Sequence, residues 1–329
     1  MLDISNKNNK KFLKMKINVA LFGLGRIGIM HAQNLKMNRK FNLKYVFDIN
    51  KKLSIKTAKK LKSTYIKNPT IAFKDKNIKV IFISSTTSTH IPLITLAAKH
   101  KKIIFCEKPL DLNIKRVIKC RKIIKKYNPK IQLGFNRRYD PGHFHLKKSL
   151  LSGKIGKLEK IIITSRDPAP PSINYLKNSG GIFRDMTIHD FDLARFYLDK
   201  DPIKEIFSSA TNLSDTRFKK IKDYEIASCV LKSRKGVITV INNSRHCKFG
   251  YDQRVEIFGD KGMLISNNKR KYNFFIDRYK IAYKLQLNDL YNLVTKNKKP
   301  RSTFEDGEKS LIIANAAFKS LKLKKVVII

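Results

Sequence analysis

The chain has 329 residues, of which 42% are hydrophobic, and a formal net charge of +46 from 71 Lys and Arg against 25 Asp and Glu. A chain of this length can form two domains with separate cores. The basic residues occur in every segment instead of forming one stripe, so we expect no specific nucleic-acid partner, only weak binding to polyanions at low salt. No window approaches the roughly 18 consecutive apolar residues that a membrane-spanning helix needs, so no membrane partner is expected.

The cysteines and the N-terminus both favour a cytoplasmic protein. The four cysteines are scattered and include no CxxC pair, which argues against a disulfide framework and fits a reducing compartment. Residues 1–16 are rich in Lys and Asn but lack the apolar core of a secretory signal, and we interpret them as a basic N-terminal extension. No recognisable spacing of His, Cys and carboxylate residues predicts a metal site.

A glycine-rich turn follows the first predicted strand. Residues 17–22 form a short, mostly apolar strand, and G-x-G-x-x-G follows directly at 23–28, ahead of a helical pattern. This context, between a strand and a helix, is that of a dinucleotide-binding loop. Gly23 would make the tight turn, Gly25 would let the backbone approach a pyrophosphate, and Gly28 would let the helix pack closely. The alternative is a glycine turn without a ligand.

An acid ends the second predicted strand. Residues 42–47 lead into Asp48, twenty positions after Gly28. A carboxylate there can accept hydrogen bonds from the adenosine ribose hydroxyls and would repel a 2′-phosphate, which favours NAD over NADP. Lys51 and Lys52 follow closely and work against that preference. An unrelated strand-end Asp is the alternative.

Polar loops follow the next predicted strands, 79–83 and 102–105. The carboxyl ends of parallel strands meet at one edge of a sheet, so we expect residues 84–90 and Glu107-Lys108 to face the glycine loop. A solvated charge pair is the alternative for Glu107 and Lys108. The residues expected to bind the cofactor are therefore Gly23, Gly25, Arg26, Ile27, Gly28, Asp48, Ser85, Thr86, His90 and Glu107.

The pattern changes after a further helix at 114–127 and a strand at 130–133. We therefore predict a dinucleotide-binding Rossmann domain over residues 17–135, with a doubly wound parallel sheet. Residues 136–329 should form an α+β domain with an open, mainly antiparallel sheet and two closing helices, at 279–295 and 307–321. Its predicted strands are 158–165, 203–210, 227–231, 236–242, 254–258 and 263–266.

Residues 180–195 carry the densest titratable chemistry of the chain. Apolar residues recur there at helical intervals and predict a helix that begins near Asp185. Asp185 and His189 would lie one turn apart, so the carboxylate could orient an imidazole that takes or gives a proton. The loop at 166–171, stiffened by prolines, should line the same site. The alternative is that Asp185 caps the helix and His189 is a core histidine.

These features together resemble a known enzyme family. The glycine loop, Glu-Lys-Pro at 107–109, Gly-Phe-Asn-Arg-Arg-Tyr-Asp at 134–140 and Gly-Gly-x-Phe-x-Asp-x-x-x-His-Asp at 180–190 are similar to the glucose-fructose oxidoreductase/inositol dehydrogenase/rhizopine catabolism family. The resemblance covers nearly everything after residue 16. Residues 165–168, 185–192 and 250–254 look most like inositol 2-dehydrogenases.

The resemblance implies a function and a set of residues. It implies NAD-dependent oxidation of a cyclic polyol, myo-inositol to the 2-keto inositol, by a homotetramer assembled through the open face of the second sheet. The implied catalytic residues are Lys108, Asp185 and His189, and the implied substrate contacts are these three with Arg137, Asp192 and Tyr251. Two alternatives stay open: a related dehydrogenase acting on another inositol isomer or a sugar, and a non-catalytic NAD-binding regulator.

Overall fold

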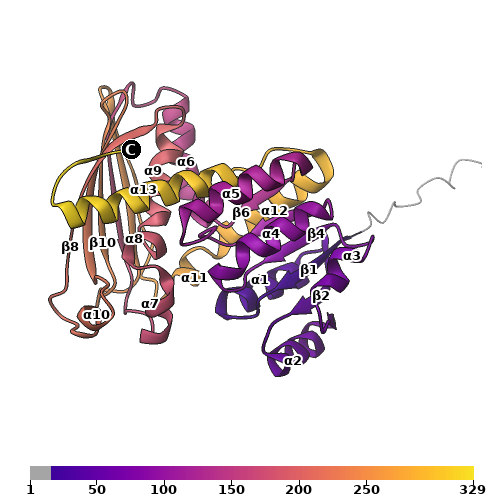
Figure 1. Cartoon of the computed structure of the whole chain (residues 1–329). Helices are drawn as coiled ribbons and strands as arrows, with labels where there is room; N and C mark the ends of the chain where they lie inside the picture. Colours follow the sequence, from indigo (N-terminus) through magenta and orange to yellow (C-terminus); the bar gives the residue numbers. More distant parts are fainter. Residues whose placement is uncertain (1–15) are drawn as a thin grey trace, which may run out of the picture.

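The computed structural model describes residues 16–329, and the predicted basic extension lies almost wholly outside them. Two sheets, each with its own helices, form two domains side by side (Figure 1). The predicted fold class, a parallel Rossmann sheet followed by a mainly antiparallel α+β domain, is confirmed.

The first sheet is parallel throughout and has the order β3-β2-β1-β4-β5-β6. The strand order reverses between β1 and β4, which makes their carboxyl ends the place where such sheets bind ligands. The strands are β1 (Ile17–Phe22), β2 (Phe41–Phe47), β3 (Thr64–Tyr65), β4 (Val80–Ile83), β5 (Ile103–Cys106) and β6 (Ile131–Leu133). The helices are α1 (Arg26–Met37), α2 (Lys51–Leu61), α3 (Thr70–Lys74), η1 (Thr87–Thr89), α4 (His90–Lys99), α5 (Ile114–Ile124) and η2 (Lys125–Tyr127).

The second sheet has the order β12-β11-β7-β10-β9-β8-β13, and β7 and β10 pair in parallel while its other neighbours are antiparallel. Its strands are β7 (Leu158–Arg166), β8 (Ile203–Thr211), β9 (Ile226–Ser233), β10 (Ile238–Ser244), β11 (Asp252–Gly259), β12 (Gly262–Ser266) and β13 (Val327–Ile328). The helices that accompany it are η3 (Asn136–Tyr139), α6 (Pro141–Leu151), α7 (Ile173–Ser179), α8 (Ile182–Asp185), α9 (Ile188–Leu198), α10 (Arg217–Lys220), α11 (Phe275–Arg278), α12 (Lys280–Lys296) and α13 (Phe304–Leu323).

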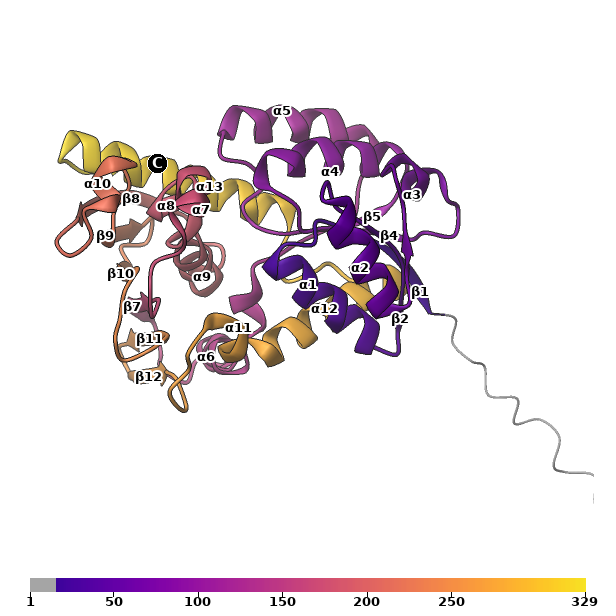
Figure 2. The same cartoon turned by 90° about the horizontal axis from the view of Figure 1, so that it is seen from below.

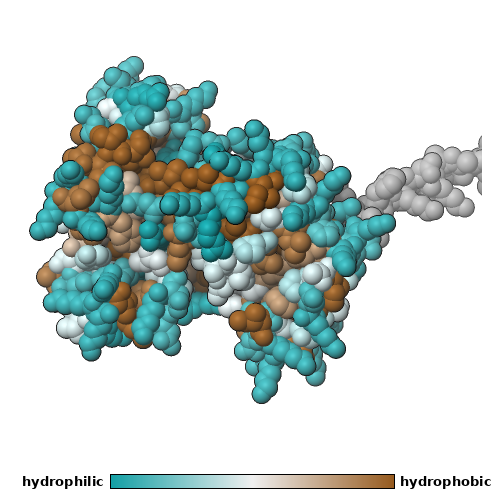
Figure 3. Space-filling model, in the orientation of Figure 1, coloured by the Kyte–Doolittle hydropathy of each residue, from teal (hydrophilic) through white to brown (hydrophobic). Residues whose placement is uncertain are grey.

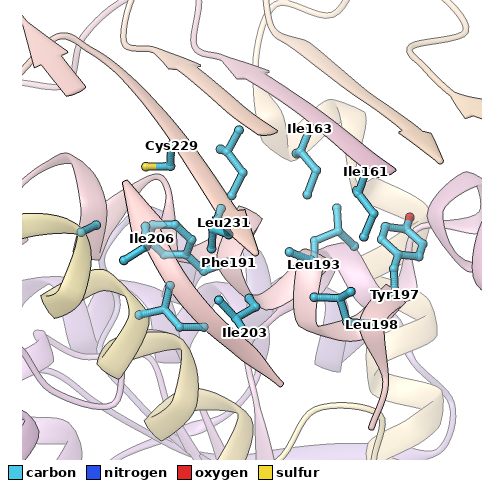
Figure 4. Close-up of a cluster of buried hydrophobic side chains, with 14 of the residues drawn as sticks. Ile161, Ile163, Phe191, Leu193, Tyr197, Leu198, Ile203, Ile206, Cys229 and Leu231 are labelled. Atoms are coloured by element: carbon cyan, nitrogen blue, oxygen red, sulfur yellow. The ribbon is translucent and has the colours of Figure 1, made fainter. Parts of the chain in front are cut away.

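One face of the second sheet packs on α9. Along β9, alternate residues are buried and exposed, as expected for a strand with one covered face. Figure 4 shows the apolar side chains of α9 directed at those of the sheet, with Phe191 near Ile206 and Leu231. This core fixes α9 against the sheet, on the side turned toward the first domain (Figure 2).

The last two long helices connect the domains. Leu287 and Leu290 of α12 belong to the core formed by β1 and β2, although this helix follows the second domain in the sequence. Leu311 of α13 packs in the first domain, whereas Ala314 and Ala317 pack in the second. The predicted boundary at 135/136 stays a prediction, and the closing helices hold the two domains together.

Candidate active site

The glycine loop has the geometry of a dinucleotide cradle. Gly23 has φ +92°, and an added Cβ would lie 2.3 Å from the backbone nitrogen of Ser85. A Cβ on Gly28 would lie 2.0 Å from the carbonyl oxygen of Gly23, so only glycine allows this approach. Gly25 has open space beside it and no side chain caps α1, which leaves backbone N–H groups available to phosphates. These residues fit NAD.

Asp48 is at the end of β2, beside this loop. Its Oδ2 accepts a hydrogen bond from the backbone N–H of Leu24 (2.6 Å), and its Oδ1 accepts one from that of Asn50 (2.8 Å). The side chain is half-buried. The structure therefore places the predicted ribose-binding carboxylate next to the predicted phosphate-binding loop.

The two remaining residues of the loop lie next to elements of the second domain. The guanidinium of Arg26 lies 5.2 Å from the ring centre of Phe274, and Ile27 packs beside a buried cluster that contains Tyr139, Tyr251 and Tyr279. This arrangement brings the tyrosine cluster to the start of α1.

The loop after β4 contains both exposed residues and a buried histidine that contacts a second loop. Ser85 Oγ lies 2.6 Å from Thr89 Oγ1, and Thr86 is exposed. His90 is only 1% exposed, and its ring nitrogens lie 2.7 Å from the Pro109 carbonyl oxygen and 3.0 Å from that of Ser85. The ring of His90 therefore joins two loops, and its predicted part in binding the cofactor stays a prediction.

Glu107 also binds within the protein. Its Oε1 lies 2.7 Å from Nε2 of the buried His31, and its Oε2 accepts a hydrogen bond from the Lys108 backbone (3.2 Å). Glu107 thus links α1 to the turn that presents Lys108, and its predicted contact with the cofactor stays a prediction.

Lys108 crosses from the first domain to the second. Its ammonium donates to the backbone oxygen of Asp185 (2.8 Å) and lies 3.4 Å from Oδ1 of the same residue. Two of the three predicted catalytic residues, separated by 77 positions in the sequence, are thus brought into contact.

The helix predicted to begin near Asp185 is in fact two helices. Asp185 ends α8 and His189 lies in the first turn of α9. Between them the helical hydrogen bonds change spacing, since the N–H of Thr187 bonds to the carbonyl of Ile182 and that of His189 to Met186. At this break the Thr187 hydroxyl donates to Asn243 Oδ1 on β10 (2.6 Å) and holds the chain to the sheet.

With the helix broken at this point, the carboxylate of Asp185 pairs with side chains other than that of His189. Its Oδ1 accepts a hydrogen bond from the Tyr175 hydroxyl (2.6 Å), and its Oδ2 accepts one from the guanidinium of Arg245 (3.1 Å). Burial alone would raise the pKa of the Asp185 carboxyl, but Lys108, Arg245 and Tyr175 outweigh it and hold that pKa below its ordinary value. Asp185 is therefore an anion at neutral pH.

His189 is half-buried beside cationic groups. Burial, together with the charges of Lys108 and Arg137, lowers the pKa of His189 well below its ordinary value, so the imidazole is neutral at pH 7. Its Nδ1 is buried, and no group among residues 16–329 hydrogen-bonds to it. The predicted orientation of His189 by Asp185 is thus not seen.

Two predicted substrate contacts are in buried ion pairs. Arg137 is 5% exposed and binds Asp190 and Ser165 through its guanidinium. Asp192 is 1% exposed and receives two hydrogen bonds from Arg138, at 2.7 and 2.8 Å. The ion pairs join residues 53 and 54 positions apart in the sequence, and the predicted substrate contacts of Arg137 and Asp192 stay predictions.

Asp167 is a candidate that the sequence did not single out, although we predicted that its loop lines the site. Burial and the neighbouring Asp185 raise its pKa to about 6, against the opposing charges of Arg245 and Arg137. Within the described chain its carboxylate has no hydrogen-bond partner, which leaves it available to a ligand. Tyr251 lies in the same surroundings, since Asp167 and Arg137 both affect its pKa, which burial raises.

The fold and these residues define a class of protein. A nucleotide cradle on a parallel sheet faces a second domain that supplies an imidazole and an ion-paired Lys–Asp couple, the arrangement of a two-domain NAD-dependent dehydrogenase. A family model described as "Oxidoreductase family, NAD-binding Rossmann fold" matches residues 17–135, and "GFO/IDH/MocA C-terminal domain" matches residues 143–265. The chain belongs to the Gfo/Idh/MocA family of oxidoreductases.

Characterised and solved relatives agree along nearly the whole chain. A myo-inositol 2-dehydrogenase of Thermotoga maritima is 38% identical over 94% of this chain and 97% of its own. The structure of a myo-inositol dehydrogenase of Corynebacterium glutamicum matches with a TM-score of 0.92 and 37% identity, over 96% of this chain and 99% of that one. The structure of a scyllo-inositol dehydrogenase of Lactobacillus casei, solved with NAD(H) and scyllo-inositol, matches with a TM-score of 0.88 and 25% identity. The match covers 95% of this chain and 99% of that one.

Proposed function

We propose that this enzyme oxidises the 2-hydroxyl of myo-inositol to a ketone with NAD. The observation that carries the proposal is the contact of Lys108 with Asp185 across the two domains, beside a neutral His189 and the nucleotide cradle. The similar enzymes that act on inositols supply the substrate class, and their identity with this chain extends through both domains.

His189 is the general base of the proposed reaction. A low pKa keeps the imidazole unprotonated at neutral pH, so it can accept the proton of a substrate hydroxyl. NAD, when bound, supplies the nicotinamide ring that accepts the hydride from the same carbon. The proton and the hydride together account for the two hydrogens that the alcohol loses.

Lys108 stabilises the charge that develops on the substrate oxygen. An ammonium has three donors, and Asp185 occupies two of them through its carbonyl and carboxylate oxygens. The third donor remains for the reacting hydroxyl, where a fixed cation lowers the barrier. Asp185, itself fixed by Arg245, keeps Lys108 in this position.

The substrate's remaining hydroxyls need hydrogen-bonding partners. Asp167 and Tyr251 are the groups that we assign to them, since both lie in the electrostatic surroundings of Arg137 and neither shares an ion pair. A non-catalytic regulator would not require an ion-paired lysine beside a neutral imidazole.

The test is a dehydrogenase screen of the inositol stereoisomers and of common aldoses, with NAD and NADP in parallel, followed by NADH absorbance. We expect myo-inositol with NAD to give the highest kcat/KM, since Asp48 repels a 2′-phosphate. Good turnover of an aldose together with failure on every inositol isomer would refute the substrate, and higher efficiency with NADP would refute the role of Asp48.

We also propose that the enzyme is a cytoplasmic homotetramer. Its four cysteines all lie in the described residues and none is in a disulfide, as a reducing compartment requires. Large apolar side chains are exposed on the outer face of the second sheet, among them Phe207 (41%), Val230 (44%) and Ile265 (50%). A patch of this kind supports association of copies through the sheet.

A further inference from the structure

We propose that Tyr175 is a positioning residue of the active site, which holds the Asp185 carboxylate in the rotamer that aligns Lys108. The proposal rests on the function proposed above. Its starting point is the hydrogen bond of 2.6 Å from the Tyr175 hydroxyl to Asp185 Oδ1, the shortest of the contacts that this carboxylate makes.

Tyr175 lies between solvent and the site. The residue is 50% exposed, yet its hydroxyl is directed at a carboxylate whose residue is only 9% exposed. An exposed ring with a buried polar tip covers one side of Asp185. The other side of the carboxylate, at Oδ2, is held by Arg245, which is fully buried.

The chain around Tyr175 is built to hold that position. Ser172 caps α7 and accepts a hydrogen bond from the Tyr175 backbone N–H (3.4 Å). At the other end, Gly180 and Gly181 have φ +84° and +81°, values that side chains rarely allow. These two positive-φ residues link α7 directly to α8, and two residues ten positions apart meet across the link.

The Tyr175 hydroxyl interacts with charged groups and does not merely pack against them. Oδ1 of Asp185 is shared by Tyr175 and Lys108, so the hydroxyl limits how that oxygen can turn toward or away from the ammonium. The Tyr175 bond also helps to keep the pKa of Asp185 low, and the anion in turn raises the pKa of Tyr175. Without this donor, Oδ1 keeps only the 3.4 Å contact with the Lys108 ammonium, and the carboxylate can rotate about its hydrogen bond to Arg245.

The test is Tyr175→Phe, with Tyr45→Phe as the matched control, since the Tyr45 hydroxyl also binds a carboxylate, that of Asp75 (3.0 Å), in the first domain. Tyr175→Phe should lower kcat roughly 10- to 100-fold, as the loss of a hydrogen bond to a charged group predicts, with less change in KM and none in NAD affinity. Tyr45→Phe should change neither kcat nor KM. An unchanged kcat in Tyr175→Phe, or a kcat and a KM that change equally, would overturn the proposal.

A second measurement does not depend on a substrate. Tyrosine ionisation is followed at 295 nm up to about pH 11, beyond the ordinary pKa of about 10. Because Asp185 keeps Tyr175 protonated, Tyr175→Phe should leave the amplitude unchanged, whereas loss of one tyrosine's amplitude would show a free hydroxyl and refute the contact. If wild type oxidises no polyol, the proposed function fails on its own, and this titration still decides whether Tyr175 holds Asp185.

Discussion

At the scale of single residues, the site separates the pKa values of neighbouring titratable groups. The pKa of His189 is lowered by burial and cations, that of Asp167 is raised to about 6 by burial, and that of Asp185 is lowered by its partners. Groups whose surroundings push their pKa values apart take different acid–base roles. In the proposed reaction the imidazole is therefore the base, and Asp185 stays an anion at neutral pH.

The base is tested by His189→Ala. Turnover of myo-inositol should fall by roughly 10² to 10⁴, the contribution of general acid–base catalysis, while the affinity for NAD stays near that of wild type. Steady-state rates and a fluorescence titration with NAD measure the two quantities. Near-normal turnover would mean that His189 is a core histidine.

A pH profile tests Asp167. In the proposed function its ionised form accepts hydrogen bonds from the polyol. That form is lost as pH falls through about 6, so kcat/KM should decline below this pH. Protonation of His189 should add no decline of kcat/KM near the ordinary pKa of histidine, because burial and the neighbouring cations lower the pKa of His189 well below that value. In Asp167→Asn the limb near pH 6 should vanish while the plateau drops. A limb that persists there in the variant would assign it to another group.

At the scale of elements, a buried polar network fixes the first turn of α9. Asp190, next to His189, binds Arg137 of η3 and accepts hydrogen bonds from Ser165 of β7 (2.6 Å) and Asn243 of β10 (2.8 Å). Three elements that meet at one carboxylate set the direction of the neighbouring imidazole. Asp190 is fully buried, so these partners supply the hydrogen bonds that water would otherwise give its oxygens.

Removal of that carboxylate should destabilise the fold. Asp190→Ala leaves Arg137 as an unpaired buried cation, and the free energy of unfolding should fall by about 3–5 kcal/mol. Urea unfolding followed by circular dichroism measures it. Glu305→Ala is the control, because that glutamate pairs with Lys309 on the surface (side chains 60% and 53% exposed) and its loss should cost about 1 kcal/mol or less. Equal losses in the two variants would contradict a structural role for the network.

The sequence predicts the regular elements well and the side-chain partners poorly. The six predicted strands of the second domain all occur, within a few residues, because alternating burial is a local signal. The break after Asp185 is not predictable from apolar spacing, and the hydrogen bond found there joins Thr187 to Asn243, 56 positions away. The short helix α7, which carries Tyr175, is likewise not predicted, because it directly follows a proline-rich loop. The pairing of Arg137 with Asp190 also could not be predicted from the sequence.

At the scale of the whole molecule, the second sheet has one covered face and one open face. The register across the strands aligns one outward row, in which each residue pairs with the next: Phe207, Val230, Val240, Ile162, Glu256 and Ile265. Figure 3 shows apolar residues gathered at one side of this domain, near the C-terminal strand and along α13, and Ile328 there is 71% exposed. Five of the six residues in the row are apolar, more than a solvated sheet face needs.

Among the helices of residues 16–329, none has both the length and the apolar character of a bilayer-crossing segment. Burial of the row between copies is the explanation that the proposed tetramer offers. Val230 lies near the middle of the row and is paired with Val240 on one side and Phe207 on the other.

Val230→Asp tests that assembly. A charge placed in each copy of an apolar interface costs several kcal/mol because it is desolvated without a partner, and the cost is repeated in every subunit. Light scattering coupled to size-exclusion chromatography should show four chains for wild type and one or two for the variant. Ile55→Asp is the matched control, since Ile55 is similarly exposed (46%) but lies on α2 of the first domain, and it should remain a tetramer. A monomeric wild type, or a variant with unchanged mass, would show that the apolar row is not the assembly surface.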